Sequence, residues 1–281
     1  MPSYHLETPL DASAEALFDW HAQPHALHRL LPPWEDTRLV ERRGGLEAGA
    51  RTVLDTSLFG PIRAQWIAEH TYCERPVGFD DVQRAGPFAS WHHRHRFHDG
   101  RLADHVDWQP PAGRLALAIA GRHLEKRIDR MFRFRHRRTV NDLARRSAPR
   151  RVAITGASGL VGTALTHFLA ATGHTVLPLV RDRARATGNA IYWNVREGVI
   201  DQEALEGVDA VVHLAGASIA SDPWTDARKH TILRSRVDGT ALLARTLTQL
   251  RQPPSVFVSG SAVGFYGDRG DEELTESSPR G

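Results

Sequence analysis

The 281-residue chain has a single cysteine, Cys73, so it cannot form an internal disulfide. This scarcity fits a reducing cytoplasm and argues against a small disulfide-stabilised secreted domain. No segment approaches the ~18 consecutive apolar residues of a transmembrane helix. The first residues also lack a basic stretch followed by an apolar one, so no secretory signal is expected. These absences predict a soluble cytoplasmic protein.

Excess charge of one sign is also scarce, because the net charge is only +3. Arginine and lysine are nevertheless crowded between Arg122 and Arg151. Such a patch is compatible with a nucleic-acid or anionic-lipid partner. Apolar residues at spacings of three and four, among them Leu124 and Ile128, favour instead the solvated face of a long amphipathic helix. We therefore predict no nucleic-acid partner and no membrane span.

A glycine-rich turn in the middle of the chain is the strongest signal that is present. A short apolar run, residues 152–154, leads into residues 156–162, where glycines stand at every third position. An Ala/Leu-rich stretch and a second apolar strand, residues 175–180, follow. The order strand, turn, helix, strand is the context of a dinucleotide site. Glycines let the backbone approach a pyrophosphate, whose charge the helix N-terminus favours.

The residue after the second strand predicts which dinucleotide binds. An acidic residue there takes the ribose 2′-hydroxyl of NAD, whereas arginine suits the 2′-phosphate of NADP. Arg181 stands at this position, which favours NADP, while the adjacent Asp182 leaves NAD open. A third buried strand, residues 209–213, ends in small residues that let the backbone approach the cofactor. The predicted cofactor-binding residues are Gly156, Ser158, Gly159, Leu160, Val161, Gly162, Arg181, Leu214, Ala215, Gly216 and Ser259.

Strands and helices alternate from residue 150 onward, with a long helix at about 226–250 and a strand at 255–262. This alternation predicts an α/β fold with a doubly wound parallel sheet and ligands at the carboxyl ends of its strands. Residues 147–150 read as a linker. We therefore predict two domains, residues 1–148 and residues 150–281.

The first half has a different order of elements. A strand at 3–10 and two helical pieces precede about six strands, and a long helix runs from after Pro110-Pro111 to about Arg146. This order resembles the START-like, polyketide-cyclase-like (SRPBCC) helix-grip fold, which is α+β. The resemblance implies a curved sheet around an apolar cavity. It carries no catalytic motif, so it implies a hydrophobic ligand and no reaction.

The histidine-rich segment Trp91–His98 raises the question of a metal site. In a strand His93 and His95 share one face, while His92 and His98 share the other. Two ligands on one face do not complete a zinc site, and the intervening arginines would repel a cation. We therefore predict no metal site.

Several phrases of the second half resemble the extended short-chain dehydrogenase/reductase superfamily. More narrowly, they resemble its atypical epimerase-like branch, whose members are often named nucleoside-diphosphate-sugar epimerases. Some members of that branch carry a START-like domain in front. The phrases that carry the resemblance are residues 155–162, 213–219, 224–229, 235–240 and 259–267.

The resemblance also implies a catalytic set. Typical reductases of the superfamily use a serine, a Tyr-x-x-x-Lys pair and an asparagine. Ser261 matches the serine best, with Ser259 close by. Arg236 stands at the asparagine position, where it could bind an acidic or phosphorylated substrate or pair with a neighbouring acid. Tyr266 is not the tyrosine of the pair, but it could donate a hydrogen bond or simply pack. The pair is expected beyond Gly281, so the Rossmann domain is expected to be incomplete at its C-terminus.

Two functions remain open at this point. The first is an NADP-dependent oxidoreductase or epimerase that acts on a small molecule, with Ser261 polarising the substrate oxygen and the front domain holding an apolar ligand. The second is a non-catalytic NADP-sensing protein, favoured by the altered catalytic set. A third, a nucleic-acid or membrane-surface protein, lacks a supporting motif.

Overall fold

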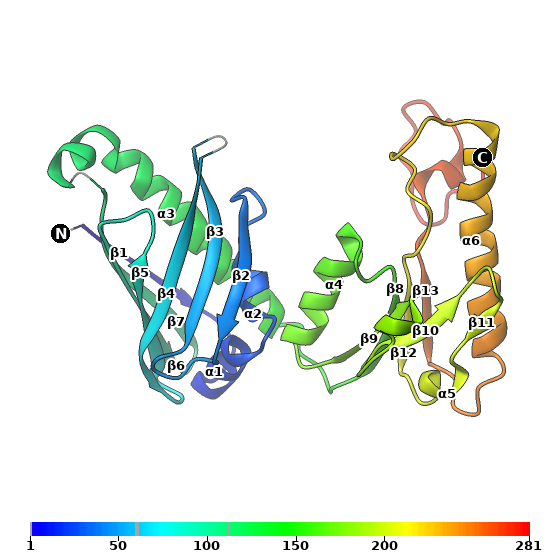
Figure 1. Cartoon of the computed structure of the whole chain (residues 1–281), viewed down its shortest axis with the longest axis horizontal. Helices are drawn as coiled ribbons and strands as arrows, with labels where there is room; N and C mark the ends of the chain where they lie inside the picture. The colour runs from blue at the N-terminus through cyan, green and yellow to red at the C-terminus, as the bar shows by residue number, and fades with distance from the viewer. Residues whose placement is uncertain (1, 60–61, 112) are drawn as a thin grey trace. The chain divides into compact units, whose positions relative to one another are not determined.

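The computed structural model describes residues 2–59, 62–111 and 113–281, with the backbone alone at 58–59 and 113–120. It divides into two compact units (Figure 1), residues 1–148 with 167–173 and residues 149–166 with 174–281. Within the described ranges, no helix combines the length and the apolar character needed to cross a membrane.

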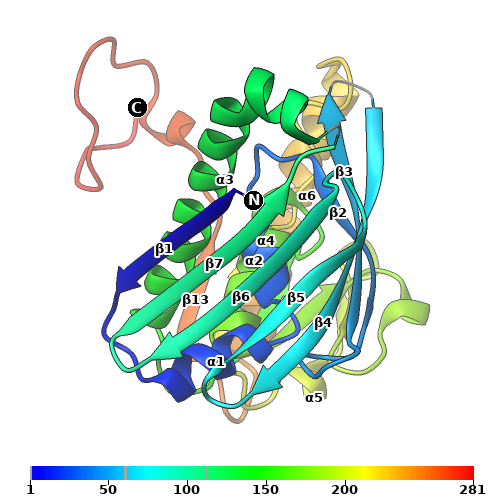
Figure 2. The same cartoon turned by 90° about the vertical axis from the view of Figure 1, so that its left-hand side faces the viewer.

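The first unit is built on a seven-stranded sheet in the order β1-β7-β6-β5-β4-β3-β2, antiparallel throughout. Each strand from β2 to β7 pairs with its sequence neighbour, which is the meander that the successive turn residues predict. Figure 2 shows these strands side by side. The strands are β1 (Ser3–Pro9), β2 (Thr37–Arg43), β3 (Arg51–Phe59), β4 (Ile62–Glu74), β5 (Gly78–Ala85), β6 (Ser90–His98) and β7 (Arg101–Gln109).

Three helices accompany this sheet: α1 (Ala14–Ala22), α2 (Ala26–Leu30) and the long α3 (Gly113–Leu143). Helix α1 begins after Ser13, whose hydroxyl accepts the Ala16 N–H and caps the helix. Helix α3 places Phe132, fully buried, in one apolar cluster with Trp91 and Trp108 of the sheet. The predicted helix-grip arrangement is therefore confirmed for this unit.

The second unit holds a six-stranded sheet in the order β11-β10-β9-β8-β12-β13. Five strands are parallel, while the short β11 pairs antiparallel with β10, a hairpin that the sequence did not indicate. The order reverses around β8, as in a doubly wound fold, so this prediction is confirmed. The strands are β8 (Arg151–Thr155), β9 (Thr175–Val180), β10 (Ile191–Asn194), β11 (Val199–Ile200), β12 (Ala210–His213) and β13 (Val256–Ser259).

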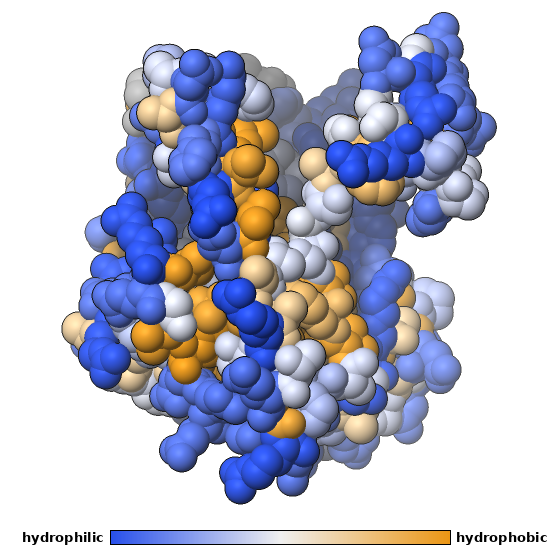
Figure 3. Space-filling model, turned by 90° about the vertical axis from the view of Figure 1, so that its right-hand side faces the viewer, coloured by the Kyte–Doolittle hydropathy of each residue, from blue (hydrophilic) through white to orange (hydrophobic). Residues whose placement is uncertain are grey.

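The helices of this fold are α4 (Leu160–Ala171), α5 (Gln202–Leu205) and α6 (Asp226–Leu247), with single 3₁₀ turns at Arg183–Arg185 and Val263–Tyr266. The core gathers Ala153 and Val211 of the central strands with Leu243 of α6, all fully buried. Strand β13 is exposed along its whole length. Figure 3 shows apolar side chains reaching the surface of the molecule among hydrophilic ones.

Candidate functional site

The turn between β8 and α4 is shaped by two of its three glycines. Gly156 has φ +71°, a left-handed conformation, and a Cβ there would lie 2.9 Å from the Ala215 nitrogen. A Cβ at Gly162 would lie 2.1 Å from the Gly156 carbonyl oxygen. Gly159 differs, because a Cβ would meet only that same oxygen, at 3.2 Å. The fold itself therefore needs Gly156 and Gly162, whereas Gly159 is exposed and leaves its surface open to a ligand.

A cleft of about 1310 Å³ opens over this turn, at the carboxyl ends of the central strands. This is the switch point of the sheet, the place where doubly wound folds bind ligands. Its walls come from four strand ends and one face of α6: residues 156–159, 178–182, 193–196, 214–218 and part of 230–238.

Charged side chains line the cleft unevenly. Arg185 lies 3.6 Å from Asp182 and Arg234 lies 3.0 Å from Asp238, so these arginines are partly neutralised. Arg181 lies at the end of β9, and within the described part of the chain no acidic side chain pairs with it. The cleft therefore offers an uncompensated guanidinium where a 2′-phosphate would be expected.

The turn after β12 is held against the glycine turn by Thr155. Its Oγ1 accepts the N–H groups of Leu214 and Ala215, each at 3.1 Å, and lies 2.6 Å from Nδ1 of His213. Burial lowers the pKa of His213 below its ordinary value. Neither Thr155 nor His213 was predicted as a site residue from the sequence, although both stand at the ends of strands that lead into the cleft.

Helix α6 holds the same turn from its other side. Ser235 accepts the Ala217 N–H at 3.0 Å, and Arg236 donates to the Ala217 carbonyl at 3.2 Å. A Cβ at Gly216 would lie 3.1 Å from Cζ of Arg236, so the missing side chain makes room for the guanidinium. Arg236 thus lies behind the lining of the cleft.

The structure brings together only part of the predicted site. The residues that line the cleft are Gly156, Ser158, Gly159, Arg181, Leu214, Ala215 and Gly216. Leu160, Val161 and Gly162 lie in the first turn of α4, outside the lining, and Leu160 is 93% exposed.

Three predicted site residues lie at or after the end of β13: Ser259, predicted to bind the cofactor, and Ser261 and Tyr266, predicted to be catalytic. Ser259 ends β13, opposite His213 in the parallel register. Ser261 is exposed in the following loop, and Tyr266 is half-buried at the end of a 3₁₀ turn. None of the three belongs to the described lining of the cleft.

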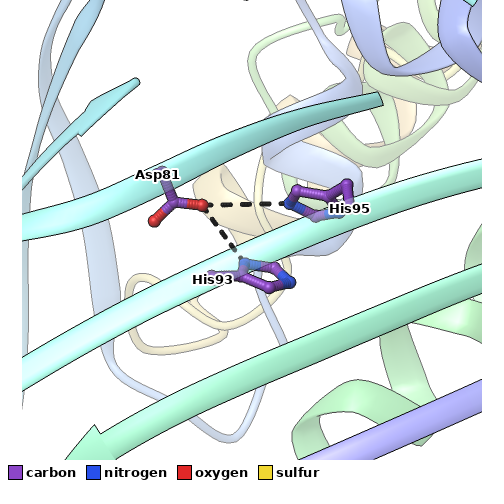
Figure 4. Close-up of side chains that lie close together, drawn as sticks. All are labelled: Asp81, His93 and His95. Atoms are coloured by element: carbon purple, nitrogen blue, oxygen red, sulfur yellow. Dashed lines mark ion pairs between the residues drawn. The ribbon is translucent and has the colours of Figure 1, made fainter. Parts of the chain in front are cut away.

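A second cavity, of about 130 Å³, lies in the first unit. Three of its side chains converge (Figure 4): Oδ2 of Asp81 on β5 lies 3.2 Å from Nδ1 of His93 and 3.9 Å from Nε2 of His95, both on β6. The alternation of the strand correctly predicted that the two imidazoles share one face. The sequence indicated only these two histidines as possible metal ligands on this face. It did not indicate Asp81, which lies on the neighbouring strand.

The electrostatics of this cluster are set by buried carboxylates. Burial lowers the pKa of His95, and the neighbouring charge of His93 lowers it further, to about 4. For His93 the attraction of Asp104 and Asp81 outweighs burial and raises the pKa to about 9.

Comparison with known families separates the two halves of the chain. Residues 152–280 match the family described as NAD dependent epimerase/dehydratase. Residues 10–134 match the family described as polyketide cyclase / dehydrase and lipid transport.

Individual relatives agree with this division. A nucleoside-diphosphate sugar epimerase of Corynebacterium glutamicum is 32% identical with a TM-score of 0.74, over 100% of this chain and 59% of that one. An epimerase family protein of Mycobacterium tuberculosis is 41% identical over 130 residues, 46% of this chain and 42% of the relative. The human epimerase family protein SDR39U1 is 33% identical over 133 residues, 47% of this chain and 43% of that protein. The chain thus spans less than half the length of these two curated relatives.

Proposed function

We propose that this chain, whose residues 152–280 match the NAD dependent epimerase/dehydratase family and whose residues 10–134 match a polyketide cyclase family, is an NADP-dependent oxidoreductase or epimerase that acts on a small molecule. The cofactor occupies the cleft over residues 156–159. The observation that carries this proposal is the combination of an open glycine turn at a helix N-terminus with Arg181 at the end of β9, which pairs with no acidic side chain among the described residues.

Arg181 supports the choice of NADP over NAD. A guanidinium can bind the 2′-phosphate through charge-assisted hydrogen bonds, whereas the 2′-hydroxyl of NAD gives it no anion to bind. Asp182, the acidic neighbour, is occupied as the cap of the next turn, because its carboxylate accepts the Ala184 N–H at 3.0 Å. That hydrogen bond occupies one oxygen of the carboxylate that would otherwise compete for the ribose.

The catalytic proposal rests on the end of β13. Ser259 is paired in register with His213, which places it at the same edge of the sheet as the glycine turn. Ser261 follows two residues later and is proposed to polarise the substrate oxygen, with Tyr266 and Arg236 as further candidates for substrate contact. None of these groups is among the described residues that line the cleft, which favours the alternative, a non-catalytic NADP-sensing protein.

The front domain is proposed to hold an apolar ligand. Its cavity is walled by Leu27, Leu46, Leu54, Trp66 and Trp91. Apolar and polar residues both line this cavity, and its volume of about 130 Å³ suits a ligand smaller than those of typical sites of ~300–1,000 Å³. We also propose the domain limits 1–148 and 150–281, and a cytoplasmic location consistent with the single cysteine.

The test is a titration of the chain with NADPH and NADH, followed by nicotinamide fluorescence at two salt concentrations. We expect tighter binding of NADPH, weakened by salt. Arg181→Ala should reduce the affinity for NADPH about 10–100-fold, because a hydrogen bond to a charged group contributes ~1.5–3 kcal/mol. The affinity for NADH should not change. The matched control is Arg183→Ala, because Arg183 packs over the Tyr192 ring outside the cleft. Failure of the unsubstituted chain to bind either dinucleotide would contradict the proposal.

A further inference from the structure

We propose that Asp81, His93 and His95 bind a divalent transition-metal ion in the cavity of the first unit. The three donors come from adjacent strands, and Asp81 stands directly opposite His93 in the register of β5 and β6. Two imidazoles and one carboxylate are a ligand set typical of zinc and of non-haem iron.

The spacing of the donor atoms fits one ion. Bonds of ~2.0–2.2 Å to a tetrahedral zinc place neighbouring donor atoms about 3.3–3.5 Å apart. Asp81 Oδ2 lies 3.2 Å from His93 Nδ1 and 3.9 Å from His95 Nε2, and one donor atom from each residue lies within 4.8 Å of the others. Figure 4 shows the carboxylate facing both rings. Small side-chain rotations bring all three donors to coordination distance.

A second layer of residues orients the ligands. Oδ1 of Asp104 lies 3.2 Å from Nε2 of His93 and 2.7 Å from Nδ1 of His95, the nitrogens that face away from Asp81. Its Oδ2 is bonded to Nε2 of His136 at 2.8 Å, and Nδ1 of His136 lies 2.7 Å from the Thr8 hydroxyl. Carboxylates behind metal-bound imidazoles fix the ring tautomer in this way. Asp104 therefore presents a lone pair of each imidazole toward the same point.

Charge balance favours the ion. With both imidazoles neutral, Asp81 and Asp104 supply two negative charges, which match a divalent cation. Arg135, which donates to the Leu30 carbonyl at 3.3 Å and also lines the cavity, adds a positive charge. The excess of positive charge favours an anion or hydroxide as the remaining ligand of the ion.

Asp81, His93 and His95 all line the cavity of the first unit. The cavity of about 130 Å³ beside them exceeds the roughly 10–15 Å³ that one water needs. A metal ion with an exogenous ligand has room there.

The test uses the whole chain, stripped of metal with a chelator and titrated with Zn²⁺ by calorimetry and with Co²⁺ by visible absorption. We expect one tight equivalent of Zn²⁺, a tetrahedral Co²⁺ spectrum, a rise in melting temperature with Zn²⁺, and no response to Mg²⁺. Asp81→Asn should abolish this tight equivalent. Asp104→Asn should weaken it about 10–100-fold, as expected for a residue that orients ligands.

The control is His98→Gln, which removes an exposed histidine from the end of the same strand and should change nothing. Near-UV circular dichroism verifies that each variant is folded, and His95→Gln carries the same test if Asp81→Asn unfolds. Two results would overturn the proposal. One is the absence of any binding at low micromolar free metal, and the other is binding that survives both Asp81→Asn and His95→Gln, which would assign the ion to a surface site.

Discussion

Thr155 Oγ1 lies 2.6 Å from His213 Nδ1, and both side chains are buried at the ends of adjacent parallel strands. The hydroxyl also accepts two backbone N–H groups, from Leu214 and Ala215. A hydroxyl has a single proton, so Thr155 donates it to Nδ1, and the imidazole is neutral with its own proton on Nε2. One side chain thus fixes the position of the turn that forms part of the cleft.

Replacing Thr155 with valine should loosen this turn. The substitution leaves the Ala215 N–H and His213 Nδ1 without this partner, at a cost of ~1–3 kcal/mol for each buried unsatisfied group, and the Leu214 N–H keeps only its 3.2 Å hydrogen bond to the Thr155 carbonyl. We expect faster hydrogen exchange at the Leu214 and Ala215 amides, together with weaker NADPH binding. Thr155→Ser keeps the hydroxyl and should retain both properties. Unchanged exchange in Thr155→Val would show that the hydroxyl does not hold the turn.

The His213 contact also predicts a pH dependence. Burial lowers the pKa of His213, so below the ordinary value of ~6.5 the unfolded chain binds a proton that the folded chain does not. The free energy of unfolding of this unit should therefore decrease as the pH falls through about 6.5. His213→Asn should reduce this slope. NMR titration of the imidazole checks the sign, since a pKa at or above the ordinary value would contradict the prediction.

The two histidines of β6 show how far sequence reasoning reaches. Strand alternation correctly placed His93 and His95 on one face, and their ring centroids lie 3.8 Å apart. Strand alternation could not predict the contact with Asp81, because that contact depends on the register of β5 against β6. Strand β5 also pairs irregularly with β4, and no local pattern predicts such irregularities. Register is a tertiary property, set by the packing of one whole face.

The dinucleotide cleft gives the same lesson. The glycine spacing predicted the turn after β8, because a Cβ at Gly156 or Gly162 would collide with backbone. The path of the loop after β13 has no periodicity, so whether Ser261 reaches the cleft could not be predicted. Thr155 and His213 are 58 residues apart, and only the parallel pairing of β8 with β12 makes them neighbours.

Stability of the first unit should depend on the pair Arg29–Asp142. The guanidinium of Arg29 on α2 binds the Asp142 carboxylate on α3 through two hydrogen bonds of 2.8 and 2.7 Å, and Asp142 is almost fully buried. Removing one partner of a buried pair costs about 3–5 kcal/mol, because the other charge is left uncompensated. Asp142→Asn should therefore markedly lower the urea midpoint of this unit.

The control for that experiment is an exposed pair, Arg43–Glu41, which is 2.6 Å apart on β2. Exposed pairs contribute only about 0–1 kcal/mol, so Glu41→Gln should have little effect. Tryptophan fluorescence follows unfolding, since Trp20, Trp91 and Trp108 are buried in this unit. Equal midpoints for the two variants would show that burial of the Arg29–Asp142 pair does not stabilise the unit.

The last prediction separates the structural glycines from the one that faces the cofactor. Gly162→Ala should destabilise the second unit, because its Cβ would lie 2.1 Å from a backbone oxygen and the turn must shift, at a cost of ~1–3 kcal/mol. Gly159→Val should leave the fold nearly unchanged, since its φ lies outside the left-handed region and only one backbone atom is near. It should nevertheless abolish NADPH binding, because the valine fills the space that a pyrophosphate needs. A folded Gly159→Val chain that binds NADPH with unchanged affinity would place the cofactor elsewhere.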